Sequence, residues 1–399
     1  MFVSNNLTSE RKKMRISKRA RAFIISLATV MSITAIPAHA NINLQGSGAS
    51  FVGNVVDACK SGYNKKSGNS IAYNPAGSST GVRNADANIG DFWFSDAAHL
   101  ASTRRSSVIN IPLVAAPIAV LHNLPARTQL YLSPETLAGI FAGQITKWND
   151  PKIVADNNRE ITEVIYRKGK DGNVLKDKDG KNVVLRNVKK NIRYTLPNRD
   201  IKVFYRSDGS GTTNNFTRYL NAVAPSIFTK PANNAFTTAF PGDLNAAGNR
   251  GRIVGASQSQ GVALNAGQTK YSITYAEVSF AATNGLKVAA LGNASGNFIL
   301  PTSTSTSAFI GGSRIDNATG AVTFDYQTKE PGAYPLSIVS YMLFDTDPRD
   351  KARGKAVKEW AQYLLTEDCV NGDAKETGFI FLTGKVRTTV EEFINRIKL

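Results

Sequence analysis

Three times within the first 220 residues, a strand-like run leads into a turn rich in glycine and hydroxyl side chains, and a helix-like run follows. The turns read GSGASF (46–51), AGSSTG (76–81) and DGSGTT (208–213). Strands that alternate with helices in this way indicate α/β architecture. The nearly continuous apolar run INIPLVAAPIAVLHNL (109–124) is typical of a buried parallel strand. At 399 residues, the chain is long enough for two domains.

The first forty residues predict a secretory signal. Seven basic residues at positions 11–21 precede a short apolar run, 23–36, and the small-residue sequence PAHA ends at Ala40. This order is the signature of a signal peptide, so we expect residues 1–40 to be removed and the protein to be exported, to the periplasm, cell envelope or extracellular space. A retained anchor is the weaker alternative because the apolar run is short. The segment from Met14 is a complete signal by itself, so either Met1 or Met14 could be the start.

Charge and composition narrow the classes of partner. Removal of residues 1–40 takes away seven Lys/Arg and one Glu, which leaves 41 basic and 29 acidic residues, a net charge of +12. No basic run interleaved with aromatic residues and no nucleic-acid motif is present, so a solvated basic surface is favoured over nucleic-acid binding. The cysteines and histidines that remain, Cys59, Cys369, His99 and His122, match no zinc spacing. We therefore expect no metal, no cofactor and no enzyme activity.

Other segments predict ordinary elements. SPETLAGIFAGQITKWNDPKI (133–153) predicts one helix with Ser133 as N-cap and Pro134 at its first position. Residues 156–202 alternate polar and apolar residues around Asp-Gly pairs, which predicts one or two β-hairpins. Within them DKDG lacks the spacing of a calcium loop, so a turn is favoured. VKEWAQYLLTEDC and TTVEEFINRIK, near the C-terminus, predict amphipathic helices.

The three turns together predict a site for a small anion. A helix N-terminus offers N–H donors and positive partial charge, hydroxyl groups add donors, and glycine lets the backbone approach closely. Arg206 lies beside the third turn, and Asp96 follows the third strand. Arginine supplies charge-assisted hydrogen bonds to an oxyanion. No lysine follows Gly211, so the third turn is not a nucleotide phosphate loop.

The quoted segments resemble the phosphate-binding protein of the phosphate ABC transporter, the PstS type. GSGASF matches the family's Gly-x-Gly-Ala-[Thr/Ser]-Phe, and GSSTG matches its Gly-Ser-Ser-Gly-Gly turn. DFWFSD, ETLAGIFAGQITKWND and RSDGSGT match three further family motifs. The likeness is firm over residues 46–220 and looser towards the C-terminus.

The resemblance implies a two-domain periplasmic-binding-protein fold of type II, in which each domain is a mixed sheet flanked by helices and the ligand lies in the cleft between them. It implies a discontinuous domain I, residues 41–116 plus 335–399, and a domain II, residues 117–334, in which the hairpins of 156–202 are an insertion. It also implies a monomer that captures inorganic phosphate and delivers it to membrane ABC permease subunits.

Carried over by motif, the phosphate ligands would come from all three turns and from the end of the third strand. They are Ser50, Phe51 (through its backbone N–H), Ser78, Asp96, Arg206, Ser210, Gly211 and Thr212. Asp208 would position the guanidinium of Arg206. An acceptor-only Asp96 would favour phosphate, which carries a proton at neutral pH, over sulfate, which carries none.

Each assignment has an alternative. Arg206 could be a surface ion-pair partner of Asp208, Asp96 could cap a following helix, and Ser79 rather than Ser78 could contact the anion; we favour the ligand roles. Val52, Thr80 and Trp93-Phe94 depart from the family pattern, and Trp93 and Phe94 are more often core than rim.

Two further questions stay open at this stage. Cys59 and Cys369 would both fall in domain I, so they could form a disulfide, although Cys59 equally suits a buried free thiol. The alternatives to phosphate capture are a phosphatase-like hydrolase and a binder of another tetrahedral oxyanion such as sulfate or molybdate.

Overall fold

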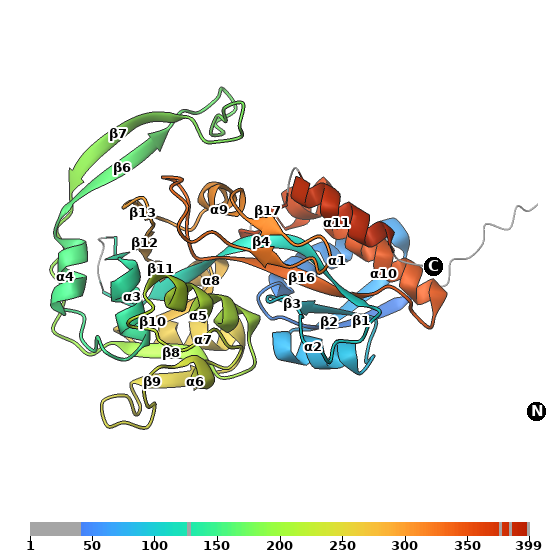
Figure 1. The fold of residues 1–399 in the computed structure, drawn as a ribbon, viewed down its shortest axis with the longest axis horizontal. Coiled ribbons are helices and arrows are strands. Elements are labelled where there is room, and N and C mark those ends of the chain that lie inside the picture. The colour runs from blue at the N-terminus through green and yellow to red at the C-terminus, as the bar shows by residue number, and fades with distance from the viewer. Residues whose placement is uncertain (1–40, 126–128, 375–376, 383–384, 397–399) are drawn as a thin grey trace, which may run out of the picture. The chain divides into compact units, whose positions relative to one another are not determined.

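The computed structural model describes residues 41–125, 129–374, 377–382 and 385–396 (Figure 1). The predicted signal peptide, residues 1–40, lies outside the described residues. The described residues belong to one compact unit, Asn41–Leu399. Among them, no helix has both the length and the apolar character needed to cross a membrane. The expected boundaries of domains I and II stay a prediction.

A mixed sheet runs through the centre of the fold, in the order β2-β1-β3-β16-β4-β10-β8-β9 (Figure 1). These strands are β1 (Asn43–Gly48), β2 (Ser70–Asn74), β3 (Phe92–Ser95), β4 (Val108–His122), β8 (Lys202–Arg206), β9 (Ile253–Ala256), β10 (Ser272–Glu277) and β16 (Ser337–Asp345). β1 pairs in parallel with β2 and β3, and β8 pairs in parallel with β9 and β10. Two short strands, β11 (Lys287–Val288) and β17 (Ile380–Phe381), also pair with β4. The predicted α/β fold is confirmed.

The direction of β4 corrects one expectation. The apolar run at 109–124 does form a buried strand, but β4 is antiparallel to both β16 and β10, not parallel. Its partners change along its length, with β16 opposite residues 108–117 and β10 opposite residues 118–122. A strand covered on both faces is apolar on both faces whatever its direction, so the pattern indicates burial rather than pairing.

Helices cover the sheet, and the local sequence explains their limits. They are α1 (Gly53–Ser67), α2 (Ser78–Asp86), α3 (Pro134–Phe141), α4 (Pro151–Asn157), α5 (Gly211–Val223), α6 (Phe236–Ala239), α7 (Gln258–Gln268), α8 (Ser279–Thr283), α9 (Ser303–Ile310), α10 (Lys351–Leu364), the π-helix η1 (Asp368–Asp373) and α11 (Lys385–Asn395). α1 buries the apolar positions expected from its periodicity and ends at Gly68, whose φ of +76° is left-handed. Trp93 and Phe94 are buried, as predicted for core residues.

The helix predicted over 133–153 is wrong as a single element. Ser133 caps α3 as expected, since its side chain accepts a hydrogen bond from the amide of Thr136. α3 stops at Phe141, and α4 begins only at Pro151 behind its own cap, Asp150. Gly143 has a φ of +77°, which takes the backbone out of the helix between them. A second N-cap followed by proline is the signal that separates the two helices.

Residues within 156–202 form antiparallel strands β6 (Glu160–Tyr166) and β7 (Val184–Asn191), which project from the body in Figure 1. Gly172 and Gly180, in the two Asp-Gly pairs beyond them, have φ values of +80° and +78°, as such tight turns require. That this segment is an insertion stays a prediction. The smaller strands are β5 (Tyr131–Leu132), β12 (Ala290–Gly292), β13 (Phe298–Ile299), β14 (Arg314–Ile315) and β15 (Val322–Thr323).

The two cysteines form a disulfide, which resolves the alternative left open by the sequence. Cys59 lies on the buried face of α1, Cys369 lies in η1, and neither is exposed to solvent. The bond joins segments separated by 310 residues in sequence. It therefore ties the first helix of the described chain to the segment that follows α10.

Candidate functional site

The three glycine- and hydroxyl-rich turns come together at the carboxyl ends of β1, β2 and β8. The amide of Gly77, in the second turn, donates to the carbonyl of Gly48, in the first, over 2.7 Å. The amide of Ser79 donates to the carbonyl of Gly209, in the third turn, over 3.0 Å. Ligands of α/β proteins bind at the carboxyl ends of strands, so this convergence marks a candidate site.

Two glycines allow the turns to pack this closely. Gly77 has a φ of +97°, and a Cβ atom there would lie 2.6 Å from a carboxylate oxygen of Asp208. A Cβ atom at Gly211 would lie 2.7 Å from the hydroxyl of Ser78 and 2.8 Å from Cβ of Asp96. These spacings are shorter than contacts between real side chains, so larger residues at either position would force the turns apart.

Arg206 is the cation of this cluster, and only 2% of its surface is exposed. Its Nε and Nη2 atoms donate to the two carboxylate oxygens of Asp208 over 2.7 and 2.5 Å, and Nη1 donates to Ser259 over 3.1 Å. Burial acts to raise the pKa of Asp208, but the hydrogen bonds and charge of Arg206 hold that pKa below its ordinary value. The pair is therefore a buried, fixed fork and not the surface ion pair considered above.

Asp96 is the buried acceptor on the other side of the cluster. One of its carboxylate oxygens accepts from the hydroxyl of Ser340 over 2.6 Å, and the other accepts from Thr212 over 3.3 Å. No described helix begins directly after Asp96, so the capping alternative is wrong. Burial raises its pKa to about 6, although the hydrogen bonds and the charge of Arg206 act to lower it. In its ionised form this carboxylate can only accept hydrogen bonds.

The remaining sequence-predicted residues lie around these two. The hydroxyl of Ser78 accepts from the amide of Asp96 over 3.2 Å, and Ser79 accepts from the side chain of Asn234. Ser210 caps α5, because its hydroxyl accepts from the amide of Thr213 over 3.1 Å. Gly211 and Thr212 form the first turn of α5, where backbone N–H groups have no partner within the helix. Ser50 lies 3.4 Å from the hydroxyl of Ser259, and Phe51 beside it is buried.

The structure adds a fourth turn that the sequence reasoning missed. β9 ends at Ala256, and α7 begins at Gln258, whose φ of +63° is rare for a residue other than glycine. The amide of Gln258 donates to Asp208 over 2.8 Å, and the amide of Ser259 donates to the hydroxyl of Ser50 over 3.3 Å. The sequence GASQSQG (255–261) has the same character as the three recognised turns, and that signal could have identified it.

The second missed residue is Glu277, the last residue of β10. Only 1% of its surface is exposed, and neither carboxylate oxygen has a donor at full hydrogen-bond geometry, although the hydroxyl of Ser259 and its own amide act as weak donors. It interacts electrostatically with Arg206 and Asp96. Its position at the carboxyl end of a strand parallel to β8 is the signal that could have found it.

The two described histidines, His99 and His122, have partners or surroundings of their own. The Nε2 atom of His99 contacts the carboxylate of Asp86 at 3.0 Å. Burial, with the charge of Lys287, lowers the pKa of His122 to about 3, which keeps that imidazole neutral. In the part of the chain that the structure describes, no group of three or more His, Cys, Asp or Glu could hold a metal ion.

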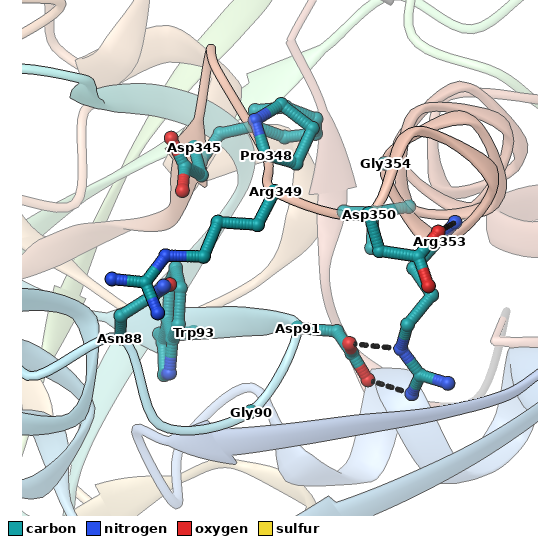
Figure 2. A pocket seen from close by; sticks show the side chains of 12 residues that line it. Asn88, Gly90, Asp91, Trp93, Asp345, Pro348, Arg349, Asp350, Arg353 and Gly354 are labelled. Carbon is teal, nitrogen blue, oxygen red and sulfur yellow. Dashed lines mark hydrogen bonds and ion pairs between the residues drawn. The ribbon is translucent and has the colours of Figure 1, made fainter.

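A separate pocket lies at the opposite end of β3, where the guanidinium of Arg353 faces the carboxylate of Asp91 in Figure 2. Nε and Nη2 of Arg353 donate to the two oxygens of Asp91, each over 2.5 Å. Asp91 precedes β3 and Asp96 follows it, so this pocket is not part of the cluster around Arg206. Arg353 and Asp91 are thus paired with each other, and Asp345, which also lines the pocket, pairs with Arg105.

Comparisons with known proteins agree with this arrangement. Residues 34–368 match the model of the PBP superfamily domain. The chain is 30% identical over 342 residues to phosphate-binding protein PstS 3 of Mycobacterium tuberculosis, which covers 83% of this chain and 80% of that one. It is 29% identical to phosphate-binding protein PstS of Pasteurella multocida, over 86% of this chain and 87% of the relative.

Solved structures show the same fold. A high affinity periplasmic phosphate-binding protein (PfluDING) bound with phosphate superimposes with a TM-score of 0.61 at 22% identity, over 88% of this chain and 93% of that one. A phosphate-binding protein from Stenotrophomonas maltophilia gives a TM-score of 0.58 at 18% identity, over 88% and 94%. The chain belongs to the family of PstS phosphate-binding proteins, within the PBP superfamily.

Proposed function

We propose that this protein captures inorganic phosphate outside the cytoplasm and delivers it to an ABC-type permease. The observation that carries the proposal is that a buried cation, Arg206, and a buried acceptor, Asp96, both lie among four turns that begin helices. Donors alone would suit any oxyanion, whereas an ionised acceptor requires a ligand that still carries a proton. Phosphate meets both conditions at neutral pH.

We propose that the ligands are donors from the turns, with Asp96 as the acceptor. The set is Ser50, the amide of Phe51, Ser78, Asp96, Arg206, Ser210, Gly211 and Thr212. Asp208 fixes the plane of the Arg206 guanidinium through two hydrogen bonds. Ser259, which contacts both Arg206 and Ser50, holds the fourth turn against this set.

The proposed role is transport and not catalysis. The two relatives compared above are named as phosphate-binding proteins, and the two histidines in the described part of the chain, His99 and His122, have their own surroundings: His99 contacts Asp86, and His122 is buried near Lys287. The monomeric state, the export and the permease contact belong to the proposal as well. Export is supported by the signal-like segment at residues 1–40.

Calorimetry of the mature protein tests the function directly. Titration with inorganic phosphate should give saturable one-to-one binding, and titration with sulfate should give binding at least about 100-fold weaker. An assay of phosphate-ester hydrolysis on the same sample should show no turnover. Turnover would support the hydrolase, and equal affinity for sulfate would support a general oxyanion binder.

The role of Asp96 in selectivity gives a sharper prediction. Asp96→Asn should reduce the discrimination between phosphate and sulfate by about 100-fold, because the amide can donate to an anion that has no proton. In the wild type, the discrimination should also decrease as the pH falls below about 6. There Asp96, whose pKa burial raises to about 6, gains a proton and becomes able to donate.

A matched control is available for this substitution. Asp57→Asn removes the same charge from an exposed carboxylate that pairs with Lys60 on α1. It should leave both affinities unchanged within about twofold, since exposed ion pairs contribute little. If Asp96→Asn and Asp57→Asn show the same selectivity, Asp96 does not reject sulfate.

A further inference from the structure

Glu277 is a residue near the cluster to which the site described so far assigns no role. It ends β10, immediately across the sheet from β8, which ends at Arg206. Its side chain is buried, and neither oxygen has a donor at full hydrogen-bond geometry, although the hydroxyl of Ser259 and the amide of Glu277 itself act as weak donors toward it. A buried carboxylate with such weak donors is costly to ionise, so its neutral form or an external partner must account for its presence.

The groups around Glu277 determine which charge it can carry. In the described part of the chain, the charged groups that act on it are Arg206, from β8, and Asp96, from the loop after β3. The hydroxyl of Ser259, from α7, and the amide of Glu277 itself also favour the ionised form. Asp96 and burial oppose it.

The positive charge of Arg206 is already balanced within the site. Arg206 donates two hydrogen bonds to Asp208, so one carboxylate already balances its charge. Asp96 adds a second carboxylate. An ionised Glu277 would be a third, and the cluster would carry a net charge of about −2 before any anion arrived. Such a site would repel a phosphate ion in a poorly hydrated space.

We propose that Glu277 completes the anion site as an uncharged carboxylic acid, and that its ionisation weakens phosphate binding. The inference rests on the proposed function, because it concerns the same site and the same ligand. Glu277 acts here as a positioning residue that sets the charge around Arg206. In its neutral form the carboxyl group also has an O–H donor, whereas its ionised form can only accept.

The direction of the pH dependence follows from this assignment. Burial raises the pKa of Glu277 to about 8, and the charge of Asp96 acts in the same direction. Below that pH the side chain keeps its proton, and above it the side chain becomes an anion. If the bound state requires the proton, Glu277 adds no pH dependence to phosphate binding well below pH 8, and above that pH it lowers the affinity by up to tenfold per pH unit.

The test is a pH series of phosphate dissociation constants measured by calorimetry. For the wild type we expect about 50-fold weaker binding at pH 10 than at pH 8. Glu277→Gln keeps the shape of the side chain and cannot ionise, so its affinity should change by less than about threefold between pH 8 and pH 10. Most of the second ionisation of inorganic phosphate lies below pH 8, so the ligand changes its charge only slightly over that upper range.

A matched control makes the same change from glutamate to glutamine at a position far from the site in sequence. Glu163→Gln alters an exposed glutamate on β6 and should retain the wild-type pH dependence. Thermal unfolding of each variant at both ends of the pH range confirms that binding is compared between folded proteins. Equal pH slopes for wild type and Glu277→Gln would overturn the inference.

A measurement on the wild type alone covers the case in which Glu277→Gln fails to fold. Near pH 9, binding of inorganic phosphate should take up close to one proton from the buffer, which calorimetry in buffers of different ionisation enthalpy detects. Binding without proton uptake would contradict the role of Glu277 but leave phosphate capture intact. Absence of phosphate binding at every pH would contradict the proposed function itself.

Discussion

Replacement of Arg206 by glutamine is expected to weaken phosphate binding by about 10³-fold or more. Arg206 is the buried cation among the converging turns, and its guanidinium is held by Asp208 and Ser259. Glutamine removes the charge that attracts the anion and also leaves the half-buried carboxylate of Asp208 without its ion-pair partner. The remaining anionic groups, Asp96 and Asp208, would then repel phosphate.

Arg218→Gln is the matched control, because it removes the same charge from an exposed arginine on α5, near the candidate site in sequence. The side chain of Arg218 donates a hydrogen bond to Asn214. The phosphate affinity of Arg218→Gln should therefore stay within about twofold of the wild-type value. Arg206→Lys keeps the charge but not the two-pronged geometry, so it should bind with intermediate affinity. Calorimetry measures the phosphate affinity of each variant, and thermal unfolding checks that each variant is folded. Wild-type affinity in a folded Arg206→Gln protein would remove Arg206 from the proposed ligands.

The sequence was informative where a residue type is tied to backbone geometry. Glycine and hydroxyl residues between a strand and a helix predict a turn at a helix N-terminus, and the sheet brings three such turns together. Ser133 was identifiable as an N-cap because a short polar side chain beside a helix start has few other uses. The apolar run of β4 was identifiable as a buried strand because a strand covered on both faces is apolar on both faces.

Other features depend on contacts between distant segments, and local patterns do not contain them. The direction of β4 is set by its pairing with β16, which lies more than two hundred residues away in the chain. Glu277 ends an apolar strand and looks like an ordinary polar end, because the charges that act on it, Arg206 and Asp96, come from distant segments of the chain. The turn at Ser259 carried a local signal, but one serine-rich turn by itself is commonplace.

Reduction of the Cys59–Cys369 disulfide is expected to lower the free energy of unfolding by about 4 kcal/mol. The bond closes a loop of 310 residues, and a crosslink across so long a loop removes much of the conformational entropy of the unfolded chain. The expected effect is large because α1 and η1 lie near opposite ends of the described chain. Urea denaturation of the mature protein, with and without a reductant, measures it through the shift of the unfolding midpoint.

The double variant Cys59→Ala/Cys369→Ala separates the crosslink from the packing of the two side chains. Both cysteines are fully buried, so alanine also removes a sulfur atom from the core at each position, and the variant should be somewhat less stable than the reduced wild type. The addition of reductant should not change the variant further. Phosphate affinity should change by less than about twofold in the folded variant, because Cys59 lies beyond the first turn of α1, whereas Ser50 and Phe51 precede that helix. If oxidised and reduced wild type unfold at the same urea concentration, the disulfide does not stabilise this fold.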